Sequence, residues 1–494
     1  MATPASSRGG RRWLWVSLAV YAAVLWFGVT PHEVGSSWRE CDTMAMSRNF
    51  LLDGFDPLRP RVDWRGDTDG AVESEFPLYQ MLVAASLAAF GEVEWPARLW
   101  SLLAMVWAGV ALHRLLEWRT GPGPALVGTL VFLGSAQAVL LGARVQPDGL
   151  STALLLAGSA AFLDYLVFGR GAALWLAVVA NALGVLQKAT GLQIVAVQGL
   201  LVLCIAPHRL REARLWIGLL VIVGVLAAWL WHGVQLHAET GLTFGVLSAG
   251  ETKFPGLRQL RSFDVWSSLL STTMRIGLGP FGCMALGTLV ARRRLDRIDL
   301  SLLVVVGLAL VGAMRYSAYE GTGPHYHVFV AVAGAWCMAR VWPRRAPQWL
   351  WAVTVLGIGM VGAHWVLQER EKVRSCTHAG VLDVAAVIRA SFAADALAIV
   401  RSHREGYDAW WRRRTNYEEP VLLYQARRRG WVVPADGFEV AELERLRARG
   451  ADFVVDQLPG QASAEVQGWL AANAELVLDR SGCTVHRLRP SPAK

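Results

Sequence analysis

Long apolar runs occupy the first three quarters of the chain. Between residues 1 and 366 they recur at roughly 17–25 residues, the length that crosses about 30 Å of hydrocarbon. The first run has basic flanks but no small-residue cleavage site before a soluble domain, so it is predicted as a retained span. The predicted membrane-spanning helices cover residues 13–30, 97–117, 124–142, 149–168, 171–187, 190–206, 213–235, 267–291, 299–315, 326–342 and 346–366.

One shorter apolar run, over residues 77–91, is not predicted to cross. It starts at Pro77 and ends at Gly91, which suits an interfacial or re-entrant helix in the first outer loop. If it crossed, there would be twelve spans and several arginine clusters would move to the outer side. Eleven spans keep the basic loops in the cytoplasm, as the positive-inside bias requires. The N-terminus is then cytoplasmic and the C-terminus extracytoplasmic.

The pattern changes near residue 370, where apolar runs shorten and charged residues become frequent. We therefore divide the chain into a transmembrane module, residues 1–368, and a small extracytoplasmic α/β domain, residues 369–494. Within that domain the predicted elements are strands at 396–400 and 453–455, helices at 420–429 and 440–449, and a closing hairpin at 475–488. An oxidising compartment permits a disulfide between Cys376 and Cys483, and this pairing stays open.

Composition agrees with a membrane protein. The chain has 494 residues, of which 54% are hydrophobic, and its net charge of +9 lies mostly in the loops predicted to be cytoplasmic. Anionic lipids and the positive-inside bias explain that charge, so it does not indicate a nucleic-acid partner.

Charged residues gather in the first outer loop, residues 38–79, directly after the first span. Charge beside hydrocarbon is costly, so such a loop is a candidate functional site. A carboxylate there suits proton abstraction from an acceptor, and cations suit a phosphate. The candidate bases are Asp42, Glu40 and Glu75. The candidate donor and phosphate contacts lie in this loop and in later outer turns: Arg39, Asp148, Lys188, Arg315, His325 and His327.

Several short motifs occur in order along these outer loops. They read WRECDTMAMSRNF, VDW, ESEFPLY, QPDGL, QKATGL and GPHYHVFV. Together they resemble the bacterial protein-mannosyltransferase-like enzymes, which belong with the aminoarabinose transferases to the C-type (GT-C) superfamily of membrane glycosyltransferases. The resemblance covers residues 1–366 well and the segments EEPVLLYQARRRGW and ARGADFVVD more weakly.

The resemblance implies a transferase that uses a polyprenyl-phosphate-linked sugar on the outer face of a bacterial inner membrane. Asp42 matches the family's catalytic base, and Glu40 ranks second. Glu75 and Asp148 match further family acids, while Lys188 and the His325–His327 segment match donor-phosphate or lipid contacts. Gln187-Lys188-Ala189 departs from the family, in which glycine or proline more often follows the lysine. A single displacement with one base predicts inversion at the anomeric carbon.

Each candidate residue has a simpler competing interpretation. Asp42 is also placed to cap a helix or to pair with Arg39. Glu75 is placed to cap the helix that follows Pro77, and Asp148 to favour a helix dipole. Lys188 interrupts an apolar stretch and is long enough to reach the membrane surface.

No cofactor is assigned. Two histidines two residues apart are a weak metal site, so no metal ligand is named and a divalent ion stays open. Asp63, Asp67 and Asp69 lie in a glycine-rich loop that suits either Ca²⁺ or simple solvation. No sequence pattern identifies the sugar or the oligomeric state. The acceptor is a lipid, a glycan or a protein.

Two alternatives of other kinds are a polytopic transporter and a lipid-linked oligosaccharide ligase. A transporter is expected to interrupt matching helices in two repeated halves, and the sequence shows no such symmetry. The first-loop aspartate motif argues against the ligase.

Overall fold

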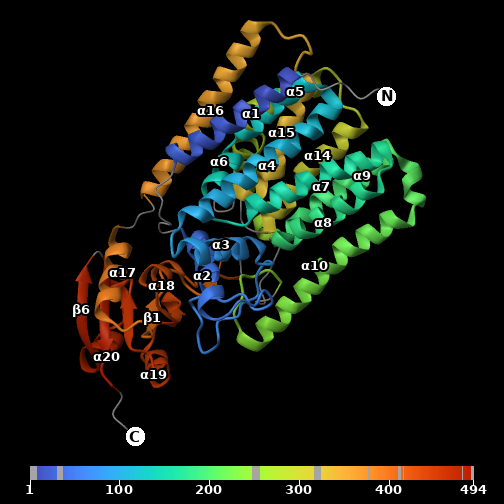
Figure 1. Cartoon of the computed structure of the whole chain (residues 1–494). Coiled ribbons are helices and arrows are strands. Elements are labelled where there is room, and N and C mark those ends of the chain that lie inside the picture. Colours follow the sequence, from blue (N-terminus) through green and yellow to red (C-terminus); the bar gives the residue numbers. More distant parts are fainter. Residues whose placement is uncertain are drawn as a thin grey trace. The chain divides into compact units, whose positions relative to one another are not determined.

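The computed structural model describes residues 8–29, 37–247, 256–315, 324–375, 379–409, 413–415, 417–480 and 482–490. The chain divides into two compact units, each built from segments that are distant in sequence (Figure 1). The first unit comprises residues 1–31, 97–229 and 253–372, and the second comprises residues 32–96, 230–252 and 373–494.

Helices make up the described part of the first unit. Their bounds are α1 (Arg8–Gly28), α4 (Trp95–Thr120), α5 (Pro122–Leu133), α6 (Ala136–Ala143), α7 (Asp148–Phe168), α8 (Gly171–Gln187), α9 (Leu192–Ile205), α10 (Ala213–Thr240), α11 (Leu257–Leu260), α12 (Phe263–Thr272), α13 (Gly279–Ala291), α14 (Arg297–Arg315), α15 (Val328–Val341) and α16 (Gln348–Ser375). Each of the eleven predicted spans overlaps one of these helices or a broken pair. Among the described helices, five are long and apolar enough to cross a membrane, or six with one bent pair, so the count of eleven stays a prediction.

Two predicted spans are interrupted, which the continuous apolar runs did not reveal. Helices α5 and α6 bend by 62° at a short break, where the side chain of Ser135 caps α6 by accepting from Ala138 N. Between α12 and α13 the backbone forms a π-helical turn, η3 (Thr273–Leu278), and Gly279 then adopts φ +66°. The predicted spans over 124–142 and 267–291 are thus each built from two helical segments. A long apolar run indicates that a segment lies in the membrane, but it does not indicate whether the backbone of that segment stays helical throughout.

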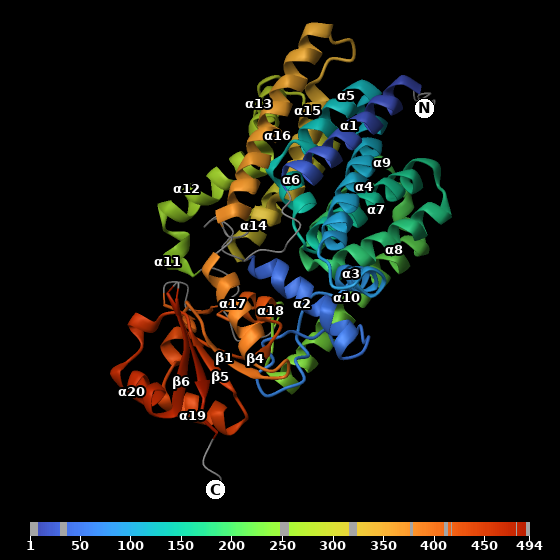
Figure 2. The same ribbon diagram turned by 60° about the vertical axis from the view of Figure 1, so that its left-hand side comes forward.

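The second unit contains a five-stranded sheet in the order β4-β1-β5-β7-β6. The strands are β1 (Leu397–Arg401), β4 (Arg429–Val433), β5 (Phe453–Asp456), β6 (Ala474–Arg480) and β7 (Cys483–Leu488). β4, β1 and β5 run parallel, and β7 and β6 close the sheet as an antiparallel hairpin (Figure 2). A separate antiparallel ribbon pairs β2 (Tyr407–Asp408) with β3 (Arg413–Arg414). The predicted strands and closing hairpin are confirmed.

Side chains alternate between the two faces of this sheet, as the two-residue period of a strand requires. Ile399 and Val454 face a core with α19 (Val440–Ala448) and α20 (Ala464–Asn473). Val400 and Val455 face the opposite core, which includes α17 (Ala379–Ser391) and α18 (Val421–Ala426).

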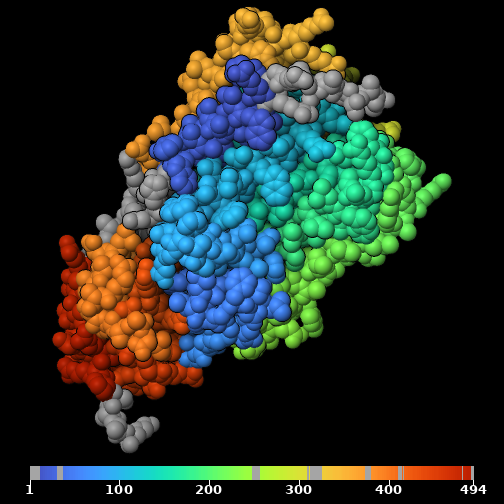
Figure 3. Space-filling view, viewed as in Figure 1, coloured from blue at the N-terminus to red at the C-terminus, as the bar shows by residue number. Residues whose placement is uncertain are grey.

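The first outer loop contributes to that second core. Met46, Val62, Trp64 and Val72 are buried in the same cluster as Val400. Figure 3 shows the two segments side by side, the loop in blue and the C-terminal residues in orange and red. The loop contains α2 (Trp38–Leu52) and α3 (Leu78–Phe90), the latter being the short helix predicted over 77–91. The predicted division at residue 368 follows sequence order, whereas the compact unit also includes residues 32–96 and 230–252.

Candidate active site

Asp42 lies in the second turn of α2, with its side chain inside the second unit. Its residue is only 1% exposed. Oδ1 accepts a hydrogen bond of 2.9 Å from the indole Nε1 of Trp64. Oδ2 is buried and has no hydrogen-bond partner among the described residues. A buried carboxylate oxygen without a partner is rare and calls for an explanation. Here it is an oxygen available to receive a proton.

The surroundings make this carboxyl a stronger proton acceptor than an ordinary aspartate. Burial raises the pKa of Asp42 well above its usual value, because removing a carboxylate from water disfavours its charged form. The Trp64 hydrogen bond and the Arg39 charge lower the pKa, while Asp63 and Glu418 raise it further. A general base works best when its pKa is close to the working pH.

Two competing interpretations of Asp42 are excluded. The N-cap of α2 is Ser37, so Asp42 is inside the helix and not its cap. Arg39 forms its ion pair with Glu75, at 3.0 Å, and affects Asp42 only through its charge. Glu75 is thus engaged with a cation, and the N-cap position of α3 is Pro77 without a side-chain cap. The structure brings together Arg39 and Glu75, which were both predicted as site residues.

Glu40 is buried in the first turn of α2, at 3% exposure. Residues two apart in a helix do not face each other. Glu40 and Asp42 therefore lie on different faces of α2, so one hydroxyl would meet only one of them.

A buried ion pair links α2 to the loop segment that follows it. Arg48 Nη2 lies 2.6 Å from Asp63 Oδ2, and Asn49 Nδ2 donates to Asp63 Oδ1 at 3.0 Å. Arg48 also lies over the Tyr424 ring, 5.1 Å from its centroid. Asp63, predicted as a solvated or Ca²⁺-binding loop acid, is instead fully buried. Trp64, Arg48 and Asn49 were not singled out individually, although the quoted VDW and SRNF strings contain them.

The acids predicted as a possible Ca²⁺ site are held by different arginines. Asp67 pairs with Arg445 and Arg449, and Asp69 pairs with Arg59 and Arg61. Within the described ranges, no group of three or more metal-binding side chains is positioned around one point.

Glu73 joins residues 230–252 to the first outer loop. Its residue is 1% exposed. It accepts hydrogen bonds from Thr243 Oγ1 and from the backbone N of Leu247, the latter at 2.8 Å. Phe244, next to Thr243, packs edge-on against Trp64 with ring centroids 5.6 Å apart. Glu73 was predicted only as one of several first-loop acids, and Phe244 was not predicted, because their partners are about 170 positions away in sequence.

A second cluster of predicted residues forms in the first unit. Lys188 Nζ lies 3.3 Å from Asp148 Oδ1 and 5.4 Å from the centre of the Tyr326 ring. The His325 ring packs against Tyr326 at 4.3 Å. These four residues line one pocket of about 270 Å³, together with Ser151, Thr152, Thr190 and Gln193. Three of the predicted donor contacts, Asp148, Lys188 and His325, are thus brought together.

Three predicted donor contacts are not part of that group, and one of them, Arg39, pairs with Glu75 in the second unit. His327 is fully buried, and neither ring nitrogen has a hydrogen-bond partner among the described residues. It does not line the Lys188 pocket. Arg315 ends α14, and its side chain is outside the described part. Cys376, proposed as a disulfide partner of the buried Cys483, also lies outside the described residues.

Comparison with known proteins identifies the fold. Residues 74–232 match the family described as dolichyl-phosphate-mannose-protein mannosyltransferase. This segment contains Glu75, Asp148 and Lys188 but not Asp42. The structure of ArnT from Cupriavidus metallidurans bound to undecaprenyl phosphate matches with a TM-score of 0.63 and 14% identity, covering 96% of this chain and 98% of that chain.

The chain has the GT-C-type fold of ArnT.

Two further solved structures share this GT-C-type architecture. Archaeoglobus fulgidus AglB, in complex with an inhibitory peptide and a dolichol-phosphate, gives a TM-score of 0.54 at 11% identity and covers 98% of this chain and 75% of that chain. Mycobacterial arabinofuranosyltransferase AftD gives a TM-score of 0.53 at 17% identity and covers 91% of this chain and 37% of that chain. No curated protein matches this GT-C-type protein by sequence. The predicted fold class, a helical GT-C-type protein with a small C-terminal sheet, is confirmed.

Proposed function

We propose that this protein transfers a sugar from a polyprenyl-phosphate donor to an acceptor on the outer face of a bacterial inner membrane, with inversion and with Asp42 as general base. The observation that carries the proposal is the partnerless, buried Oδ2 of Asp42 beside an Oδ1 fixed by Trp64. The family match over residues 74–232 and the likeness to ArnT support a lipid-phosphate donor.

The proposed reaction is a single displacement. The acceptor's hydroxyl or amine attacks the anomeric carbon while its proton passes to Asp42 Oδ2. The bond between that carbon and the phosphate oxygen breaks, and polyprenyl phosphate leaves with the electron pair. Because attack and departure occur on opposite sides, the anomeric configuration inverts. One base is sufficient, and the phosphate leaves without a general acid.

We assign the Lys188 pocket to the donor phosphate. Asp148 accompanies the Lys188 ammonium at 3.3 Å, and Thr190 also lines the pocket. The hydroxyls of Ser151 and Thr152 instead donate to the backbone oxygens of Gly184 and Asp148. A compact cation beside a hydroxyl suits a phosphate group. Asp148 then positions the ammonium when no phosphate is bound. His327 and Arg315 have no role in this assignment.

We place the C-terminal sheet outside the cytoplasm and the N-terminus inside, from the distribution of basic residues. The acceptor is a lipid, a glycan or a protein. AglB shares the fold, so a lipid-linked oligosaccharide donor is the second candidate; the size of the transferred glycan separates it from a monosaccharide transferase.

The test is transfer from radiolabelled polyprenyl-phosphate sugars in membranes that contain the wild type, Asp42→Asn or Asp67→Asn. Asp67 is a first-loop acid bound by surface arginines, so Asp67→Asn is the matched control. We expect transfer with the wild type and the control, a loss of about 10²–10⁴-fold with Asp42→Asn, and a product of inverted configuration. Equal transfer by all three proteins, or retained configuration, contradicts the mechanism.

A further inference from the structure

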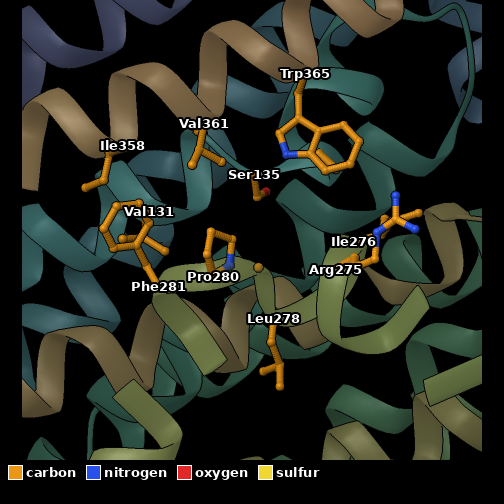
Figure 4. A pocket seen from close by; sticks show the side chains of 13 residues that line it. Val131, Ser135, Arg275, Ile276, Leu278, Pro280, Phe281, Ile358, Val361 and Trp365 are labelled. Atoms are coloured by element: carbon orange, nitrogen blue, oxygen red, sulfur yellow. The ribbon is translucent and has the colours of Figure 1, made fainter. Parts of the chain in front are cut away.

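A pocket of about 310 Å³ opens in the first unit, apart from the Lys188 pocket. Three segments surround it: the junction of α5 and α6, the turn from η3 into α13, and the middle of α16 (Figure 4). None of its lining residues also lines the Lys188 pocket. It is therefore a separate cavity that the proposed reaction does not use.

Both helix interruptions of the fold meet at this pocket. Ser135, at the α5–α6 break, and Gly279, at the end of the π-helical turn, are among its lining residues. Irregular backbone at membrane depth is tolerated only where protein buries it or where it lines a cavity. π-Helical turns also occur frequently at functional sites. The two breaks are therefore evidence that the cavity takes a ligand.

Arg275 is the cationic member of the lining and belongs to the candidate span Phe263–Ala291. Among the described residues it forms no ion pair, and no acidic residue lines the pocket. Arg275 is exposed on the protein surface, where an arginine of a membrane span is costly unless an anion or water accompanies it. Figure 4 shows Arg275, Ser135 and Trp365 around one hollow.

The remaining walls are apolar. Val131, Leu278, Phe281, Ile358 and Val361 line the space next to Ser135. The ligand must therefore be an amphiphile with one anionic group, since a free anion would leave this surface exposed to water. Such a ligand would place its phosphate at the mouth of the pocket and extend its hydrocarbon chain into the surrounding bilayer.

We propose that this pocket binds an anionic phospholipid, with its phosphate between the Arg275 guanidinium and the Ser135 hydroxyl and an acyl chain along Val361 and Phe281. Arginine binds a phosphate through two parallel hydrogen bonds, which fixes the headgroup. Because the pocket has one cation and no carboxylate for an ammonium headgroup, phosphatidylglycerol is preferred over phosphatidylcholine. The lipid would tie the two broken helices to α16.

The test uses the purified full chain, delipidated in detergent and titrated with phosphatidylglycerol. Bound lipid is counted by native mass spectrometry, and thermal unfolding is followed in parallel. We expect saturable binding of phosphatidylglycerol by the wild type, weaker binding of phosphatidylcholine, and about tenfold weaker phosphatidylglycerol binding by Arg275→Gln. The control is Arg292→Gln, which removes an exposed arginine at the other end of α13 and outside the pocket.

Two further variants separate lipid loss from misfolding. Arg275→Lys keeps the charge and should bind more weakly than the wild type but more tightly than Arg275→Gln. Val361→Trp keeps the arginine but fills the apolar wall, and should also release the lipid. Equal binding by wild type and Arg275→Gln, or equal loss in Arg292→Gln, overturns the proposal. Displacement of phosphatidylglycerol by equimolar undecaprenyl phosphate also overturns it, because the pocket would then belong to the donor. None of these readouts depends on sugar transfer.

Discussion

The indole nitrogen of Trp64 lies 2.9 Å from Oδ1 of Asp42 and donates to it, which leaves Oδ2 as the carboxylate oxygen without a described partner. One oxygen is used to fix the side chain, and the other is available for chemistry. Trp64 is itself 3% exposed and packed in the core that the first outer loop shares with the C-terminal sheet. The orientation of the proposed base therefore depends on the folding of a domain more than 300 residues further along the chain.

Replacing Trp64 tests this positioning role. Trp64→Phe keeps an aromatic ring in the core but removes the hydrogen bond that lowers the pKa of Asp42. We expect transfer to fall by about 10-fold or more and the acidic limb of the pH–rate profile to move to higher pH, since the carboxylate loses a donor that stabilises its charge. A uniform loss of rate with an unshifted profile would mean that Trp64 only supports packing.

The raised pKa of Asp42 also predicts the direction of the wild-type pH dependence. Transfer requires the ionised carboxylate, so the rate should fall as pH drops through the raised pKa, above the value of about 3.9 for a free aspartate. Transfer rates with saturating donor, measured across pH in sealed vesicles, test this. A rate that stays constant down to about pH 4 would contradict it.

Stability should show the opposite pH dependence. Because the folded state raises the pKa, it binds the proton more tightly than the unfolded chain does. The stability from that proton is fully present below the unfolded pKa and is lost as pH rises through the folded pKa. Asp42→Asn removes this dependence, so its melting temperature should exceed that of the wild type at high pH, with the gap closing on acidification. Parallel melting curves at every pH would refute this.

The buried pair of Arg48 and Asp63 should contribute mainly to stability. Asp63→Asn leaves the Arg48 charge uncompensated in the interior, which costs about 3–5 kcal/mol. We expect a strongly lowered unfolding midpoint in denaturant. The transfer rate per folded molecule should fall far less than in Asp42→Asn, and the acidic limb of its pH profile should move to lower pH because the Asp63 charge raises the pKa of Asp42. Asp67→Asn, at a partly exposed pair, should lower the midpoint by no more than about 1 kcal/mol.

Lys188 and Asp148 should act on donor binding and not on proton transfer. Lys188→Gln should raise the KM for the polyprenyl-phosphate donor by about tenfold, with a smaller change in kcat. Asp148→Asn releases the ammonium from its counter-ion at 3.3 Å, so it should raise KM less than Lys188→Gln does. Donor titrations of both variants measure this, with Lys372→Gln as the control. A loss confined to kcat would assign the lysine to the chemical step.

Features that depend on local sequence patterns were predicted, and features that depend on contacts between distant residues were not. The apolar runs located the helices of the eleven predicted spans, and the short run at 77–91 gave α3, whereas α11 and α17 were not predicted. The strands at β1 and β5 and the hairpin of β6 and β7 were also predicted, because alternation and turn residues are local signals. The breaks at Ser135 and Gly279 were missed, since an apolar run does not report whether its backbone stays helical.

By itself, the sequence determined the fold class and the positions of the apolar helices, and it supplied Asp42, Asp148 and Lys188 as candidates. These conclusions rest on hydrophobic length, charge distribution and ordered motifs, which need no knowledge of contacts. Only the tertiary structure decided that Oδ2 of Asp42 is left without a described partner, that Asp63 is a buried counter-ion and that Glu73 binds Thr243. Burial and hydrogen bonding are set by residues far apart in sequence, so they appear only after the chain has folded.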